Sequence, residues 1–273
     1  MRIPRFWQKA GQPVQTAQGA TWRLEAWGWS DESEAAAAAL ARERLQAQAE
    51  AIAAGRGQRE RYLYHDRPLR EEVLERPLPG ALITRNGYGA RILNAAQVAF
   101  VDVDVDLPAG EPGFFGKLFG ARSLQEALDE QLELLRLALE GIASARVYRT
   151  RAGLRLLLTD RLYVPNDPET LSLLEALGSD PLYRTLCREQ ECFRARLTPK
   201  PWRCAQPVFP SRWPYFDPEK VRRWVERYER ACARLAATEY LATVGGDAVH
   251  PAVRPVLELH DRLSGAASGL PLA

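Results

Sequence analysis

The alternation of apolar and polar residues predicts strands in the first hundred positions. Residues 21–29 (TWRLEAWGW) alternate in a strand-like manner, and residues 81–93 (ALITRNGYGARIL) place Asn-Gly between two apolar arms. Asn-Gly favours a two-residue hairpin turn, because both central residues of a type I′ turn take positive φ. In that register Arg85 faces Tyr88, and Leu82 faces Arg91. A further strand at 99–106 follows closely, so we expect the three strands to form a meander.

Helical periodicity appears in two longer segments. Residues 34–54 are rich in alanine, with Ser30 or Asp31 as the expected N-cap and Gly55 as the stop. Residues 123–142 carry leucines at helical spacing after a capping Ser123. Residues 144–160 then read as two short strands around Ala152-Gly153. This order of elements predicts an α+β fold, a mostly antiparallel sheet backed by helices on one face.

The pattern divides the chain into three parts. Residues 1–20 are polar and predict a flexible N-terminal arm, and residues 21–165 form the α+β core. Residues 166–273 predict a mainly helical C-terminal extension. It begins with two short helices opened by Asp-Pro, continues through a basic segment at 194–203 and a loop rich in proline and aromatic residues at 204–218, and ends with a long helix at 219–243 and one more helix.

Composition narrows the function classes only a little. The chain has 273 residues, 46% of them hydrophobic and 26% charged, and its net charge of +2 gives no broad attraction to nucleic acid or membrane. No apolar stretch is long enough to span a membrane, and the N-terminus has no apolar leader, so we expect a cytoplasmic protein with no membrane partner. The spacing of Cys187, Cys192, Cys204 and Cys232 matches no standard zinc motif, which favours free thiols.

The segment AFVDVDVDLP, residues 99–108, is the strongest chemical signal in the chain. Alternate side chains of a strand share a face, so the valines point to the core while Asp102, Asp104 and Asp106 point the other way. Successive carboxylates on that face stand roughly 6.5 to 7 Å apart at Cα. Such a set can hold Mg²⁺ or Mn²⁺ through oxygen ligands. The alternative is a solvated strand face whose acidic residues discourage edge pairing.

Several basic residues are expected to lie near these aspartates. Arg85 and Arg91 belong to the preceding hairpin, and Arg149, Arg151 and Arg155 to the hairpin after the second helix. Carboxylates that hold a metal beside guanidinium groups that hold phosphate are what a triphosphate site needs. The alternative is that the arginines pair with the aspartates in an exposed network of little energetic weight.

The order of these motifs resembles the catalytic core of the archaeo-eukaryotic primase and primase-polymerase superfamily. The match covers about residues 100–160. FVDVDVD resembles the first motif of the family, which implies that Asp102 and Asp104 are metal ligands and catalytic residues. TRAGLR resembles the second motif, with Thr150 in place of its serine and Arg155 in place of its histidine. Asp160 and Asp217 are candidates for the third. The resemblance implies an RRM-like sheet and metal-dependent nucleotidyl transfer.

Two hypotheses follow. In the first, the protein is a diverged primase-like nucleotidyltransferase that binds a nucleotide or a nucleic-acid end. It would use Mg²⁺ or Mn²⁺ on the aspartate strand, and Arg149, Thr150, Arg151, Arg155 and Lys200 would contact the substrate. In the second, it is a non-enzymatic module that binds single-stranded nucleic acid or a protein. The basic segment and its neighbouring aromatic residues, among them Trp202, would then make the contacts, and the acidic strand would be only a solvated face.

Overall fold

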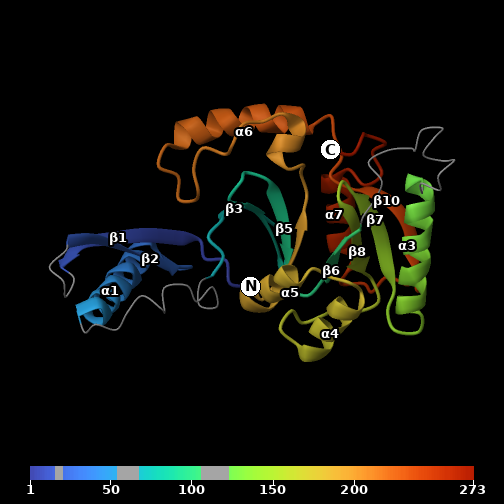
Figure 1. The fold of residues 1–273 in the computed structure, drawn as a ribbon, viewed down its shortest axis with the longest axis horizontal. Coiled ribbons are helices and arrows are strands. Elements are labelled where there is room, and N and C mark those ends of the chain that lie inside the picture. Colours follow the sequence, from blue (N-terminus) through green and yellow to red (C-terminus); the bar gives the residue numbers. More distant parts are fainter. Residues whose placement is uncertain (16–20, 54–67, 106–122) are drawn as a thin grey trace.

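A computed structural model describes residues 1–15, 21–53, 68–105 and 123–273. Within these ranges the chain forms three antiparallel sheets with helices packed against them, which confirms the expected α+β class. Figure 1 shows the β1–β2 ribbon with α1 at one end of the molecule, the sheet containing β3 and β5 in the middle, and the sheet containing β6, β7, β8 and β10 at the other end.

The N-terminal segment is a strand, whereas the sequence predicted a flexible arm. β1 (Phe6–Gln15) pairs along its whole length with β2 (Thr21–Ser30). One face of this ribbon is covered by α1 (Glu34–Ala53), and much of β1 remains exposed, which accounts for its polar sequence. Gly28 permits the close contact with α1, because a Cβ there would lie 2.1 Å from the Ala37 carbonyl oxygen. The capping side chain of α1 is Ser33, which accepts from the Ala36 N–H, and not Ser30 or Asp31.

The middle sheet has the order β3–β4–β5–β9, formed by Glu72–Leu78, Ala81–Arg85, Arg91–Ala95 and Phe193–Arg196. The β4–β5 hairpin exists, but its predicted register is wrong. Arg85 pairs with Arg91, and Leu82 pairs with Asn94. The loop has five residues because the Asn86 side chain accepts hydrogen bonds from the N–H groups of Tyr88 and Ala90, which widens the turn.

The third sheet has the order β10–β7–β8–β6 and contains the aspartate strand. Its strands are β6 (Phe100–Asp104), β7 (Ala145–Thr150), β8 (Gly153–Leu158) and β10 (Glu239–Val244). The expected meander of β4, β5 and β6 is therefore wrong, because β6 leaves the hairpin and pairs with β8. The antiparallel pairing of β7 with β8 confirms the predicted strand pair around Ala152-Gly153.

Helices cover both faces of this third sheet, whereas the sequence predicted one covered face. α3 (Leu124–Leu139) begins with the predicted cap Ser123, which forms a capping box with Glu126. α7 (Arg254–Ser264) places His260 against Phe100 and Tyr148 on the aspartate face. Figure 1 shows α3 on the other side of the sheet. The far end of the aspartate face, around Asp102 and Asp104, lines a pocket.

The C-terminal segment is not a helical extension alone, because it supplies a strand to each four-stranded sheet. Its helices are α4 (Pro168–Ala176), α5 (Pro181–Gln190), the short 3₁₀ helix η3 (Pro201–Cys204), α6 (Pro218–Cys232) and α7, and the first two are opened by Asp-Pro as predicted. The predicted helix at 219–243 ends at Cys232. Residues 239–244 instead form β10, since hydrogen bonding to β7 outweighs their helical propensity.

Candidate functional site

The first predicted metal ligand, Asp102, is engaged by an arginine. Asp102 on β6 pairs directly with Arg155 on β8. The carboxylate accepts from Nε of Arg155 at 2.7 Å and from Nη2 at 3.2 Å, so both oxygens face one guanidinium. The side chain of Arg155 is 3% exposed and that of Asp102 is 37% exposed. This is the two-pronged geometry that arginine favours with carboxylates.

Arg155 also ties the two four-stranded sheets together. Its remaining nitrogen, Nη1, donates to the carbonyl oxygen of Arg196 on β9 at 2.9 Å. Burial disfavours the charged guanidinium, but the carboxylate of Asp102 outweighs this, and the pKa of Arg155 is raised above its ordinary value. Arg155 is therefore a permanent cation that holds β6, β8 and β9 in fixed relation.

The described residues show only part of the predicted aspartate site. Both oxygens of Asp102 are taken by Arg155, and Asp106 lies outside the described residues. Asp104 is exposed and has no hydrogen-bond or ion-pair partner in the described part of the chain. Across residues 1–15, 21–53, 68–105 and 123–273, no group of three or more His, Cys, Asp or Glu side chains can hold a metal ion. A site for Mg²⁺ or Mn²⁺ stays a prediction, for which Asp104 is the available ligand.

A small pocket opens beside Asp102, with a volume of about 100 Å³. Six of the residues predicted from the sequence line it: Asp102, Asp104, Thr150, Arg151, Arg155 and Lys200. The lining also includes Arg196, Thr198, Arg203 and several apolar residues. Ligand pockets for whole small molecules measure roughly 300 to 1,000 Å³. The space therefore suits a group of a few heavy atoms rather than a complete nucleotide.

The charge around this pocket is strongly positive. Five basic side chains and two acidic ones line it, and one of the basic residues, Arg155, is neutralised by Asp102. Burial and the nearby guanidinium groups of Arg196 and Arg203 lower the pKa of Lys200, although Asp104 and Asp102 act in the opposite direction. The pKa of Arg203 is lowered by burial and by Arg196 and Arg151. These cations repel one another, so a bound anion would relieve their repulsion.

One donor in this cluster has no partner. The Nε–H of Arg196 is buried and forms no hydrogen bond within the part of the chain that the structure describes. Buried donors in folded proteins are almost always satisfied, and an exception at a functional site is commonly met by a ligand, a water or an ion. Arg196 therefore contributes to the pocket lining a guanidinium whose buried Nε–H has no partner among the described residues.

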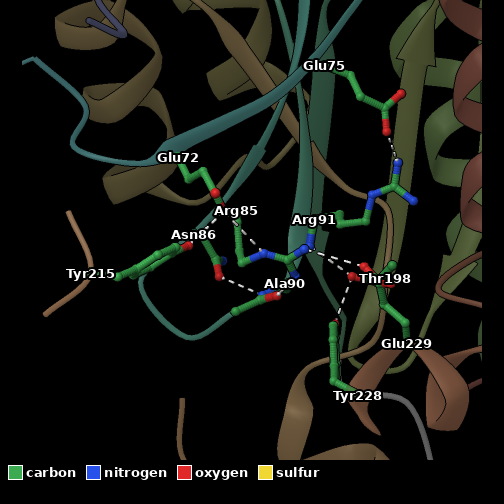
Figure 2. Close-up of polar contacts among 11 residues, drawn as sticks. Glu72, Glu75, Arg85, Asn86, Ala90, Arg91, Thr198, Tyr215, Tyr228 and Glu229 are labelled. Atoms are coloured by element: carbon green, nitrogen blue, oxygen red, sulfur yellow. Dashed lines mark hydrogen bonds and ion pairs between the residues drawn. The ribbon is translucent and has the colours of Figure 1, made fainter. Parts of the chain in front are cut away.

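Two tyrosines position the strand that carries these cations. The hydroxyl of Tyr183 on α5 lies 3.0 Å from the Phe100 carbonyl oxygen of β6 and accepts from the Arg194 N–H of β9 at 3.2 Å. On α6, the hydroxyl of the fully buried Tyr228 lies 2.7 Å from Thr198 Oγ1 and 2.5 Å from the Pro199 carbonyl oxygen. Figure 2 shows Tyr228 directed at Thr198, whose hydroxyl oxygen also accepts from the Arg91 backbone N–H at 2.9 Å.

Three predicted phosphate-binding arginines do not reach the pocket. Arg85 is 5% exposed, donates to the Gly89 carbonyl oxygen and forms ion pairs with Glu72 and Glu229, so it joins β4 to β3 and α6 (Figure 2). Arg91 pairs with Glu75 at 2.8 Å. Arg149 alternates with Tyr148 and Thr150 along β7, so it points away from the aspartate face, and it pairs with Glu239. Of the five arginines expected near the aspartates, Arg151 and Arg155 therefore line the pocket and these three do not.

Arg196 and Arg203 are the basic pocket residues that the sequence analysis did not place among the substrate contacts. Both belong to the basic segment at 194–203, which the sequence marked as a possible nucleic-acid contact. Nothing in the sequence places that segment beside the aspartate strand, because the contact depends on β9 lying against β6. The predicted free thiols agree with the structure, in which Cys187, Cys192, Cys204 and Cys232 form no disulfide.

Comparisons with known proteins add no family assignment, since no family model, curated protein or solved structure matches the chain. Among the helices that the structure describes, none has the length and apolar character needed to cross a membrane.

Proposed function

We propose that the protein binds the phosphate group of a nucleotide or of a nucleic-acid end in the pocket between β6, β8 and the segment after β9. The observation that carries the proposal is the cluster of Arg151, Arg196, Lys200 and Arg203 around a space of about 100 Å³. Phosphate combines small size with high negative charge and oxygen acceptors in several directions, which matches these donors.

Three strands of the third sheet support the proposed primase-like, RRM-like relationship, whereas the fourth, β10, lies beside β7 and not beside β6 as in an RRM-like sheet. β6 and β7 are both antiparallel to β8, which lies between them, so β6 and β7 run parallel and are connected through α3. This is a split β-α-β unit, the arrangement on which such folds are built. The family relationship forms part of the proposal. So does a cytoplasmic location, because free thiols are typical of reducing compartments.

Metal-dependent nucleotidyl transfer is a second candidate. The exposed carboxylate of Asp104 favours it, because Asp104 lines the same pocket as the cations. Mg²⁺ is often held by one or two carboxylates together with substrate phosphates. In that case the metal would bind with the ligand rather than before it, and Arg151, Arg196 and Lys200 would neutralise the phosphates.

Calorimetry with inorganic pyrophosphate tests the proposed phosphate site without involving a base or sugar. The wild-type chain is expected to bind it, and Arg196→Met should weaken binding about tenfold or more, since a charge-assisted hydrogen bond is lost. Arg149→Met is the matched control, because it removes the same guanidinium from a strand residue that does not line the pocket and that pairs with Glu239. Absence of binding at low salt, or equal loss in both variants, would refute the proposal.

A further inference from the structure

Trp202 lies next to the pocket and is largely exposed. It sits in η3 between Lys200 and Arg203, both of which line the pocket, while 60% of its own surface is accessible. The tight 3₁₀ turn is fixed by the hydrogen bond from the Arg203 N–H to the Lys200 carbonyl oxygen at 2.9 Å. Adjacent Cα atoms are about 3.8 Å apart, so Trp202 begins one residue before Arg203 and two residues after Lys200.

The indole ring is held by two neighbours. Tyr88 contacts it edge-on with ring centroids 5.5 Å apart, and Nζ of Lys200 lies 5.4 Å from its centroid. Tyr88 belongs to the β4–β5 loop and Lys200 to the segment after β9. Both residues that contact the indole are therefore attached to strands of the middle sheet. A large aromatic ring that is oriented by neighbours and still mostly exposed is a typical stacking platform in proteins that bind nucleotides or single strands.

The size of the pocket places the rest of the ligand outside it. A space of about 100 Å³ holds a phosphate but not a nucleoside. A phosphate seated among Arg196, Lys200 and Arg203 leaves its sugar at the rim, where Trp202 is the adjacent exposed ring. A planar base connected through that sugar can therefore reach the indole while the phosphate stays bound.

We propose that Trp202 stacks on the base of the nucleotide whose phosphate occupies the pocket, which makes phosphorylated nucleosides the ligand class rather than phosphates in general. This inference rests on the proposed phosphate site. Stacking of one base on an aromatic side chain is expected to strengthen binding by on the order of tenfold to a hundredfold. The nucleoside is either a free mononucleotide or the terminal unit of a single strand.

The test compares three ligands by calorimetry: pyrophosphate, ribose 5-phosphate and AMP. AMP differs from ribose 5-phosphate only by its base, so the ratio of their affinities measures base recognition. In the wild type AMP is expected to bind on the order of tenfold more tightly. Trp202→Leu should bring the two affinities together and leave pyrophosphate binding unchanged, while Trp202→Phe should restore part of the difference. Phe216→Leu is the control, because Phe216 is 98% exposed and does not line the pocket.

The outcomes separate this inference from the proposed function. If Trp202→Leu keeps the AMP preference, or if the wild type binds AMP and ribose 5-phosphate equally, the stacking inference is refuted while the phosphate site stands. If pyrophosphate does not bind at all, the proposed function fails first. A 5′-phosphorylated oligothymidylate measured beside thymidine 5′-monophosphate identifies the source, since tighter binding of the strand supports a nucleic-acid end and equal binding supports a free nucleotide.

Discussion

The carboxylate of Asp102 and the guanidinium of Arg155 face each other across neighbouring strands, joined by two hydrogen bonds of 2.7 and 3.2 Å. Residues directly opposite on antiparallel strands are close enough to interact strongly. The pair also connects to the second sheet through the Arg196 carbonyl oxygen. Asp102 therefore supports the wall of the pocket, and Asp104, two residues further along the same face, lines the same pocket with an exposed side chain.

Replacing each aspartate separately should distinguish these roles. Asp102→Ala leaves the buried Arg155 without its counter-charge and is expected to lower the free energy of unfolding by about 3 kcal/mol. Asp104→Ala, at an exposed position, should change it by less than about 0.5 kcal/mol. Urea unfolding followed by circular dichroism measures both values. Equal effects of the two substitutions would contradict the structural role of Asp102.

The hydroxyl of Tyr228 is expected to strengthen ligand binding although it does not line the pocket. Tyr228→Phe removes the hydrogen bonds to Thr198 and Pro199, so the segment carrying Lys200 loses an anchor. We expect a loss of stability of about 1 to 2 kcal/mol and a severalfold weaker affinity for pyrophosphate. Tyr240→Phe is the control, since that hydroxyl contacts only Thr243 at the surface within the described residues. Unchanged pyrophosphate affinity in Tyr228→Phe would show that this anchor is not needed.

Binding should depend on pH through Lys200. The pKa of Lys200 lies below its ordinary value of 10.5, and an anion binds best to the charged ammonium. Affinity is therefore expected to fall as pH rises through the pKa of Lys200, at a pH below 10.5. The ligand for these measurements is AMP, a phosphate monoester. Its second ionisation lies near about pH 6, so measurements from pH 8 upward avoid it. Lys200→Arg should abolish most of this dependence, and a flat wild-type profile would argue against contact between Lys200 and the ligand.

Lys200→Met should separate binding from stability. In the folded chain without ligand, Lys200 is repelled by Arg196 and Arg203, so removing its charge is expected to preserve or slightly raise the melting temperature. Pyrophosphate affinity should fall in the same variant. Thermal unfolding with and without pyrophosphate measures both effects, and a marked fall in the melting temperature without ligand would contradict the proposed repulsion.

Mn²⁺ titration tests the metal hypothesis directly. With both oxygens of Asp102 occupied, Mn²⁺ alone is expected to bind only weakly, and binding should strengthen when pyrophosphate supplies further oxygen ligands. Asp104→Asn should remove this gain. Electron paramagnetic resonance of free Mn²⁺ follows the titration. Tight binding of Mn²⁺ without pyrophosphate that survives Asp104→Asn would show that another set of ligands holds the metal.

Local sequence patterns predicted elements better than they predicted neighbours. The capping box at Ser123, the Asp-Pro helix starts and the strand pair around Ala152-Gly153 depend on contacts within a few residues, and the structure confirms them. The placement of Arg85 and Arg91 depended on the assumption that consecutive strands pair. That assumption holds in most cases, but it fails between β5 and β6, which enter different sheets.

The candidate site could be predicted only in part for the same reason. Asp102, Asp104, Arg155 and Lys200 were identified by residue type, yet their contacts required knowledge of the strand register. The two hydrogen bonds between Asp102 and Arg155 follow from the β6–β8 pairing. The presence of Arg196 in the pocket follows from β9 lying beside β6. Neither relation leaves a local signal in the sequence.

The late strands have a consequence for biosynthesis. β10 pairs with β7 across about 90 residues of chain, with Glu239 meeting Arg149, and β9 joins β5 across a similar span. During translation the growing polypeptide therefore exposes two incomplete sheets until these strands emerge from the ribosome. Contacts between such distant segments slow folding, so the nascent chain is expected to depend on chaperones for protection of its unpaired edges.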